Sequence, residues 1–240
     1  MTRLYFPGEI ADHGECRVVA GQAHHVMHVL RLQVGAALTL FDGRGMEYAA
    51  LIKRIDKSGL TLSVSKRQAV SRESPLTVVL AQGISSGERM DYTVQKCVEL
   101  GVTAIQPLIT QRSVVRLSPD RAAKRVAHWQ SVAAAACEQC GRNQVPQILP
   151  VQSLMNWLGA PADGARYLLS PRATTRLREL QRPQGALTLL AGPEGGWNPE
   201  ETDATRVAGY LPLTLGPRVL RTETAAVAAL AALQTLWGDF

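Results

Sequence analysis

Two glycine-rich stretches late in the sequence hold the residue types best suited to binding a ligand. The first, residues 192–198, follows the apolar run Leu187–Ala191, and the second follows another apolar run at residues 211–215. Glycines lack a Cβ, so backbone amides in such loops can approach a flat ring or a carboxylate closely and hold it by main-chain hydrogen bonds. Tight turns that only join strands to helices have the same composition, and this alternative stays open at this point.

The loops do not match the common phosphate-binding patterns. The G-x-G-x-x-G spacing of dinucleotide-binding folds is absent, and no Gly-Lys-Ser/Thr follows either loop as it would in a phosphate loop. A ligand bound here would therefore be recognised in a different way.

Flanking residues predict the elements that position these loops. Short, continuous apolar runs are typical of strands buried on both faces of a parallel sheet. Asn198, Pro199 and Glu201 form a strong helix start, with a capping residue, a proline in the first turn and a glutamate three residues after the cap. Thr222 or Thr224 is expected to cap the last helix in the same way. Open α/β sheets bind ligands at the C-terminal ends of their strands, where both loops would lie.

Upstream, a polar, proline-containing stretch at residues 71–75 is expected to link two domains. Beyond it, predicted strands alternate with predicted helices, which favours a parallel α/β sheet. The strands are predicted at 76–81, 104–109 and 167–170, and the helices at 88–100, 118–139 and 223–237.

Residues before the linker predict a small β-rich domain. Several short strands with close turns between them are typical of a compact barrel. One helical segment interrupts them, and its Val26, Val29 and Leu30 are expected to face the core. The predicted strands are 37–41, 48–55 and 60–65.

Composition narrows the class of protein. The 240 residues are 46% hydrophobic, which is enough for a sizeable core and argues against wholesale disorder. The formal net charge of +6 mildly favours a polyanionic partner, but the basic residues are spread evenly, so a nucleic-acid site would have to form by folding. The longest apolar run, 225–233, is far shorter than the roughly 20 residues of a membrane helix, and no signal peptide is evident. We expect a soluble, cytoplasmic protein.

Cysteines and histidines do not predict a metal site. The four cysteines are too few for a disulfide scaffold, and Cys137 and Cys140 form a C-x-x-C without the second pair that a zinc site needs. His24 and His28 stand four apart on a predicted helix, but no third ligand of suitable spacing accompanies them. We therefore expect no bound metal.

The full amino-acid sequences of the two loops are more informative than their glycine content alone. The segments GPEGGW and LGPRVLRTETA resemble the cofactor-binding loops of SPOUT methyltransferases, and most closely those of the RsmE family. That family methylates N3 of a uridine in small-subunit ribosomal RNA. Upstream segments resemble the same family, so the similarity covers nearly the whole chain. These are HHVMHVLR and FDGRG in the first third, then QGISSGERMDYTVQKCVELGVTAIQPL and AACEQCGR.

This resemblance implies a fold and partners. It implies an α/β SPOUT methyltransferase domain with a C-terminal trefoil knot at residues 75–240, preceded by a small PUA-like β-barrel at 1–71 that helps to hold RNA. It also implies S-adenosylmethionine as cofactor, 16S ribosomal RNA or the small ribosomal subunit as partner, and a homodimer. The cofactor-binding residues implied are Leu169, Ser170, Gly192, Pro193, Glu194, Gly195, Gly196, Leu215, Gly216, Leu220, Arg221, Thr222, Thr224 and Ala225.

The implied reaction needs particular side chains. Uracil N3 carries a proton, and its removal spreads negative charge onto the carbonyl oxygens, so cationic donors and a proton acceptor are required. We expect Arg142 and Arg221 to stabilise this charge and Glu223 to accept the proton. The alternative for Glu223 is stabilisation of the first turn of its helix through the macrodipole.

RNA contacts are expected from the N-terminal domain, with solvated surface charge as the alternative for each residue. The candidates are Arg3, His25, Arg31 and Arg44.

Two other functions stay open. A SPOUT enzyme could instead methylate a ribose 2′-hydroxyl or another base, because loops rather than folds set substrate choice. A non-catalytic RNA-binding factor for ribosome assembly is the second alternative, and the intact loops argue against it. The even charge distribution offers few phosphate contacts, which favours a large, structured substrate such as the assembled 30S subunit.

Overall fold

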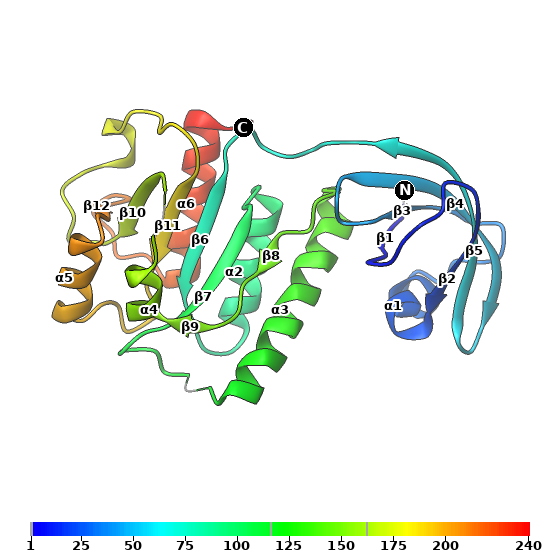
Figure 1. Ribbon diagram of the computed structural model, residues 1–240, viewed down its shortest axis with the longest axis horizontal. Coiled ribbons are helices and arrows are strands. Elements are labelled where there is room, and N and C mark those ends of the chain that lie inside the picture. Colours follow the sequence, from blue (N-terminus) through cyan, green and yellow to red (C-terminus); the bar gives the residue numbers. More distant parts are fainter. Residues whose placement is uncertain (1, 116, 162) are drawn as a thin grey trace. The chain divides into compact units, whose positions relative to one another are not determined.

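A computed structural model describes residues 2–115, 117–161 and 163–240, except for the side chains of residues 22, 25 and 28 (Figure 1). The chain divides into two compact units, one made of residues 1–73 and 134–145 and the other of residues 74–133 and 146–240. The expected domain bounds of 1–71 and 75–240 stay a prediction.

The first unit is built on a five-stranded sheet in the order β1-β3-β4-β5-β2. Only the β1–β3 pair is parallel. Leu60, Leu62 and Val64 alternate along one strand and are all buried, as expected for a strand with one face on a core. The strands are β1 (Arg3–Tyr5), β2 (Gly14–Val19), β3 (Ala37–Phe41), β4 (Met46–Asp56) and β5 (Gly59–Ala69).

The helical segment of this unit differs from the prediction. It consists of α1 (Ala20–His24) followed by the π-helical turn η1 (His25–Val29). Val26 is buried as expected, but Val29 and Leu30 are 60% and 41% exposed, so the expectation that they face the core was wrong. A π turn has a wider period than an α-helix, which rotates these residues off the buried face.

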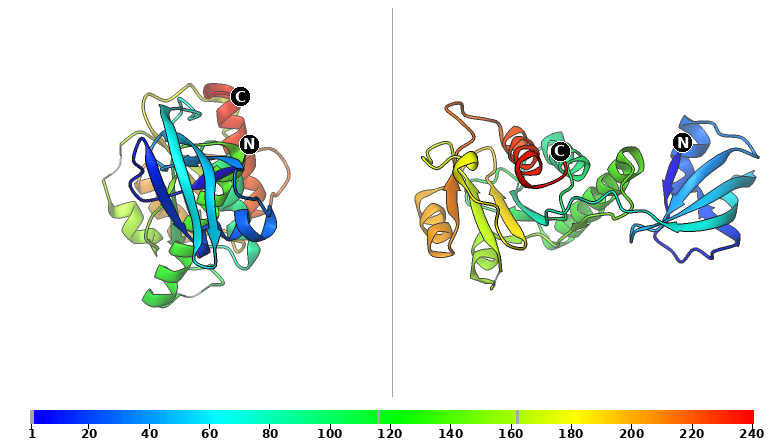
Figure 2. Two further views of the ribbon diagram at one scale, coloured as in Figure 1. Left: turned by 90° about the vertical axis from the view of Figure 1, so that its right-hand side faces the viewer. Right: turned by 90° about the horizontal axis from the view of Figure 1, so that it is seen from above.

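The second unit contains a parallel sheet in the order β12-β10-β11-β6-β7-β8, with β9 also paired to β7. Its helices α2 and α6 cover one face and α4 and α5 the other (Figure 2). The strands are β6 (Val78–Gly83), β7 (Ala104–Ile109), β8 (Gln147–Ile148), β9 (Gln152–Ser153), β10 (Ala165–Leu169), β11 (Leu187–Ala191) and β12 (Leu211–Leu213). The helices are α2 (Glu88–Glu99), α3 (Pro119–Cys140), α4 (Leu154–Gly159), the 3₁₀ turn η2 (Leu177–Glu179), α5 (Pro199–Val207) and α6 (Thr222–Trp237).

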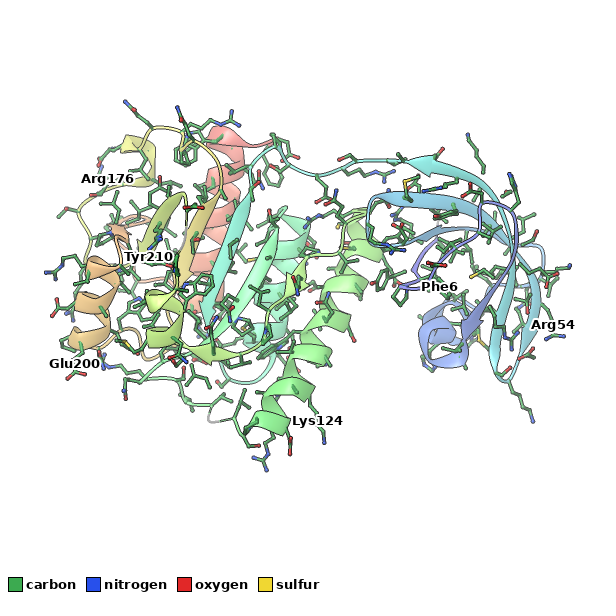
Figure 3. All side chains as sticks on the ribbon, viewed as in Figure 1. Phe6, Arg54, Lys124, Arg176, Glu200 and Tyr210 are labelled. Carbon is green, nitrogen blue, oxygen red and sulfur yellow. The ribbon has the colours of Figure 1, made fainter. Side chains whose placement is uncertain are left out.

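Side chains tie the helices to each other on both faces of this sheet. Trp157 of α4 donates a hydrogen bond of 2.9 Å to the hydroxyl of Tyr210, which follows α5 and is labelled in Figure 3. On the opposite face, Gln234 of α6 donates to the carbonyl of Leu100 at the end of α2, at 2.8 Å. No helix in the described residues is long and apolar enough to cross a membrane.

The predicted helix starts had different outcomes. The capping box of α5 is confirmed, with Glu201 N donating to Asn198 Oδ1 at 2.6 Å and Asn198 N donating to Glu201 Oε2 at 3.0 Å. At α6 the cap position is held by Arg221, with no side-chain cap hydrogen bond, so the prediction of a Thr222 or Thr224 cap was wrong. The Thr222 hydroxyl instead donates to the carbonyl of Gly192, in the other glycine loop.

Candidate active site

The loops that follow β10, β11 and β12 meet at the carboxyl edge of the parallel sheet and enclose a cavity of about 430 Å³. The strands are adjacent and parallel, so their C-terminal ends reach the same edge. The predicted cofactor residues found in its lining are Leu169, Ser170, Gly192, Pro193, Glu194, Gly196, Leu215, Leu220, Arg221, Thr222 and Ala225.

Three predicted cofactor residues, Gly195, Gly216 and Thr224, are outside this lining. Gly195 lies against the loop after β7, where a Cβ at this position would come within 2.8 Å of Arg112 Cβ. Arg112 also donates to the Gly195 carbonyl at 3.1 Å. Gly195 therefore supports the loop from outside the cavity.

Gly192 packs closely against Trp197 of the same loop, which leaves little room for a side chain at position 192. A Cβ at Gly192 would lie 3.0 Å from the indole ring of Trp197, which itself lines the cavity. The glycine thus lets the aromatic ring fold back over the start of the loop.

Several lining residues had not been assigned to the cavity. Arg218 and Val219 stand inside the second motif and could have been found from it. Arg89 had no such signal, because only the pairing of β6 with β11 brings the start of α2 to the first glycine loop. The full set of unassigned lining residues is Arg89, Pro171, Ala191, Trp197, Leu213, Thr214, Arg218 and Val219.

Glu194 is anchored on the start of α2. Its Oε1 accepts hydrogen bonds from the backbone N and the hydroxyl of Ser86, both at 2.8 Å, and from Arg89 Nη1 at 2.9 Å. Burial raises the pKa of Glu194, but these hydrogen bonds outweigh it and hold the pKa below its usual value. The ionised carboxylate therefore orders the loop that it belongs to.

Apart from the Arg89–Glu194 pair, the charged groups of the cavity lining have no ion-pair partner among the described side chains. Arg218 and Arg221 are exposed, and neither forms an ion pair with any described side chain. Glu223 also lines the cavity, and its Oε2 is buried without a hydrogen-bond partner among the described residues. Unpartnered guanidinium groups in a cavity can stabilise developing negative charge, and a carboxylate in its lining can accept a proton.

Arg142, the third predicted catalytic residue, lies in the first unit. Arg142 is 5% exposed. Its Nε donates to Glu73 Oε2 at 3.0 Å, and its Nη2 forms an ion pair with the same carboxylate. This geometry favours a structural role, and the expected catalytic role of Arg142 stays a prediction.

The Arg3 side chain is also enclosed in the first unit. Its Nη1 forms an ion pair with Glu47 Oε2 at 2.9 Å, Nη2 donates to Asn143, and the guanidinium lies 4.8 Å from the centroid of the Phe41 ring. These contacts favour a structural role for Arg3 over its expected contact with RNA, which stays a prediction.

Glu47 is the centre of this cluster. Burial raises the pKa of Glu47, but hydrogen bonds from Arg3, Gln68, Asn143 and Arg72 outweigh it and lower the pKa to about 2. A carboxylate with four donors of this kind is stabilised in its ionised form.

Two of the remaining candidates for RNA contact, Arg31 and Arg44, are exposed, unlike Arg3. Arg44 has a side chain that is 65% exposed, with its Nε 3.7 Å from Asp42. Arg31 is exposed and adopts a φ of 50°, in the left-handed region that non-glycine residues rarely occupy. The side chain of His25 lies outside the described residues.

The cysteines are placed as packing residues. Cys97 is fully buried, and burial raises the pKa of its thiol to about 12. A hydrogen bond with Cys140 and burial raise the pKa of Cys137, so this thiol too stays protonated. The described residues contain no group of three or more side chains that could hold a metal ion.

Comparison with known proteins identifies the family. Residues 72–234 match the family model of an RNA methyltransferase domain, and residues 20–65 match that of an RNA methyltransferase PUA domain. The ribosomal RNA small subunit methyltransferase E of Buchnera aphidicola is 34% identical over 90% of this chain and 88% of its own length. The protein of that name from Bacillus subtilis is 29% identical, with the same coverage of both chains.

Two solved structures have the same fold over the full chain. The ribosomal RNA small subunit methyltransferase E of Neisseria gonorrhoeae, bound to S-adenosylmethionine, is 41% identical with a TM-score of 0.91. A proposed methyltransferase from Legionella pneumophila, also with bound S-adenosylmethionine, is 40% identical with a TM-score of 0.96. Each alignment covers 100% of this chain and 99% of the other. The chain therefore belongs to the RsmE family of RNA methyltransferases, the family that its two glycine loops resemble.

Proposed function

We propose that this protein transfers the methyl group of S-adenosylmethionine to N3 of one uridine in 16S ribosomal RNA, acting as a homodimer on the assembled 30S subunit. One observation carries the chemical part of the proposal. Glu223 lines the same cavity as Arg218 and Arg221. Its Oε2 is buried without a hydrogen-bond partner, and neither arginine has an ion-pair partner among the described residues.

The cavity suits the proposed cofactor. Its volume of about 430 Å³ lies within the range of small-molecule sites. Leu169, Leu213 and Leu215 supply apolar walls for a flat ring, and Gly192 and Gly196 present backbone close by. When bound, S-adenosylmethionine supplies a methyl group on a sulfur that is already cationic, so the protein need not activate the donor.

The protein's own residues then have two tasks. The loops hold the reactants in line, and such positioning removes a large part of the barrier to a displacement reaction. Glu223 accepts the N3 proton, and Arg221 donates hydrogen bonds to a uracil carbonyl oxygen as negative charge develops on it. Arg218 is placed to assist at the same edge of the cavity.

The remaining parts of the proposal concern the RNA, the second subunit and the path of the chain. Exposed Arg31 and Arg44 are proposed to contact the RNA backbone. Val219 leaves an apolar side chain 81% exposed in the cavity lining, which supports closure of this site by a second subunit. The chain returns from β12 at the sheet edge to bring Thr222 against Gly192, a path compatible with the trefoil knot that the family resemblance implies.

The test is methyl transfer from radiolabelled S-adenosylmethionine to small ribosomal subunits from cells that lack this protein. The labelled RNA is digested and the nucleoside identified, with deproteinised RNA assayed in parallel. The proposal expects N3-methyluridine at a single site, and faster labelling of subunits than of bare RNA. A different labelled nucleoside would overturn the assigned target. No label, despite measured cofactor binding, would overturn the ribosomal substrate.

A further inference from the structure

Two buried glutamines on neighbouring strands share one local arrangement. Gln82 on β6 and Gln106 on β7 are 0% and 1% exposed. Each donates from Nε2 to the carbonyl of the residue that follows it, Gly83 and Pro107 respectively, at 2.9 Å. The two side chains differ in what else they contact.

Gln106 contacts only structural segments beyond its own strand. Its Nε2 donates to the Pro150 carbonyl at 2.8 Å, and its Oε1 accepts from Gln152 at 3.0 Å. Both donor and acceptor of this amide are satisfied by the segment around β9.

Gln82 instead contacts both glycine loops. Its Nε2 lies 2.9 Å from Thr222 Oγ1 and 3.3 Å from the Gly192 carbonyl oxygen. The Thr222 hydroxyl donates in turn to the same Gly192 carbonyl. Because the amide donates to the Thr222 oxygen, the hydroxyl proton is left to point at Gly192. The three groups therefore join the second loop, the first loop and β6 in one closed set of hydrogen bonds.

The backbone beside Gln82 is fitted to the first loop as well. A Cβ at Gly83 would lie 2.6 Å from both the nitrogen and the Cδ of Pro193. Only glycine allows the end of β6 to pass this close to the loop.

Packing alone does not account for an amide at this position. Gln82 Oε1 is buried with no hydrogen-bond partner among the described residues, and an unsatisfied buried acceptor destabilises the folded state. A leucine of similar size would avoid that cost, so the amide must serve its donor side, which faces the two loops.

We infer that Gln82 is a positioning residue for the cofactor site. This inference rests on the proposed function. Gln82 does not line the cavity itself, but Gly192 and Thr222 do, and it holds them at a fixed separation. Without this link, the Thr222–Gly192 hydrogen bond would be the only one between the two loops among the described residues, and the cavity between them would be less well defined.

The test is calorimetric titration of S-adenosylmethionine into the full chain and four variants. Gln82→Leu and Thr222→Val should weaken binding by on the order of tenfold, the effect of one lost buried hydrogen bond. Thr222→Ser keeps the hydroxyl and should recover most of the affinity that Thr222→Val loses. The matched control is Gln106→Leu, which should also lower the melting temperature but leave the affinity unchanged.

Steady-state kinetics and a double variant separate positioning from general destabilisation. Gln82→Leu should raise the KM for S-adenosylmethionine more than it lowers kcat at saturation. Combining Gln82→Leu with Thr222→Val should weaken binding by less than the product of the two single effects, because the groups act together.

Several results would overturn the inference. One is wild-type affinity in Gln82→Leu, and another is an equal loss in Gln106→Leu. If Gln82→Leu does not fold, equal affinities of Thr222→Val and Thr222→Ser would overturn it instead. A wild-type protein that bound no S-adenosylmethionine would overturn the proposed function, and this inference with it.

Discussion

Two largely buried arginines of the first unit and two arginines at the cavity of the second unit differ in whether they are paired. In the first unit, Arg142 is paired with Glu73 and Arg3 with Glu47, and all four side chains are at most 18% exposed. Ion pairs of this kind connect segments far apart in the sequence, since Arg142 follows α3 while Glu73 precedes β6. Each of these charges is therefore largely neutralised by its partner inside the protein.

In the second unit, the cavity contains one ion pair, Arg89–Glu194, and leaves its other charged groups unpaired. Arg218, Arg221 and the inner oxygen of Glu223 find no partner among the described residues. Residue type alone does not separate the two cases, because both sets are arginines and glutamates. Whether a charged side chain has an ion-pair partner therefore separates charges that stabilise the fold from charges that are available to a substrate.

Breaking a pair in the first unit should have the largest effect on stability. Arg142→Ala leaves the Glu73 carboxylate without its partner, and we expect the free energy of unfolding to fall by about 3–5 kcal/mol. Urea unfolding of the full chain measures this, with Arg125→Ala as a control, because Arg125 is exposed and has no ion-pair partner among the described side chains. An unfolding free energy equal to that of the control would show that the pair is not structural.

Removing an unpaired charge from the cavity should affect the reaction and not the fold. For Arg221→Ala we expect methyl transfer to slow by roughly 100-fold, the loss typical of one donor to a developing oxyanion. The unfolding free energy should change by less than about 0.5 kcal/mol, as for other exposed side chains. Arg206→Ala, an exposed arginine on α5, is the control for both measurements, and equal rates for the two variants would remove Arg221 from the mechanism.

Acid should weaken the first unit through Glu47. The pKa of this carboxyl is lowered in the folded state, so its contribution is complete above the ordinary value of 4.5 and is lost as the pH falls from there towards 2. We expect a loss of about 2–3 kcal/mol across this window. Urea titrations at several pH values would show it, and Glu47→Gln should lack this part of the pH dependence. An unchanged acid slope in that variant would contradict the assignment.

The smallest effect on cofactor binding is expected at Arg89 and Glu194, which are paired with each other and also line the cavity. The Arg89 side chain is 43% exposed, so its ion pair is screened by solvent. Arg89→Ala should weaken S-adenosylmethionine binding by no more than about fivefold, corresponding to at most about 1 kcal/mol. Lys96→Ala removes another ion pair from the same helix and should leave the affinity unchanged. A loss of a hundredfold or more in Arg89→Ala would place Arg89 among the direct ligands.

Much of the second unit could be predicted from local sequence. The runs at Ala104–Ile109 and Leu187–Ala191 are strands with the expected bounds, and the capping box of Asn198 starts α5. In the first unit, the strands β1 and β2 were missed. β1 has only three residues, which is too short for a pattern, whereas β2 has six and its Cys16 and Val18 alternate with polar residues, so local sequence could have predicted it. The continuous helical pattern of α3 gives no sign that residues 134–145 join the first unit.

The sequence motifs predicted the two loops of the candidate site, but not the residues that contact these loops from elsewhere in the chain. Both glycine loops lie at the cavity, but the roles of Gln82 and Arg89 depend on the pairing of β6 with β11, more than 100 residues later in the chain. Thr222 illustrates the limit of local reasoning. Its position predicts a helix cap, while its hydroxyl is used by a loop 30 residues away.

The most direct test compares two isosteric variants, Glu223→Gln in the cavity and Glu47→Gln in the first unit. The quantity measured is the methyl-transfer rate constant per folded molecule, at saturating S-adenosylmethionine and ribosomal subunits. The account predicts a loss of roughly 100-fold or more in Glu223→Gln and a wild-type rate in Glu47→Gln. A wild-type rate in Glu223→Gln, or a comparable loss in both variants, would contradict it.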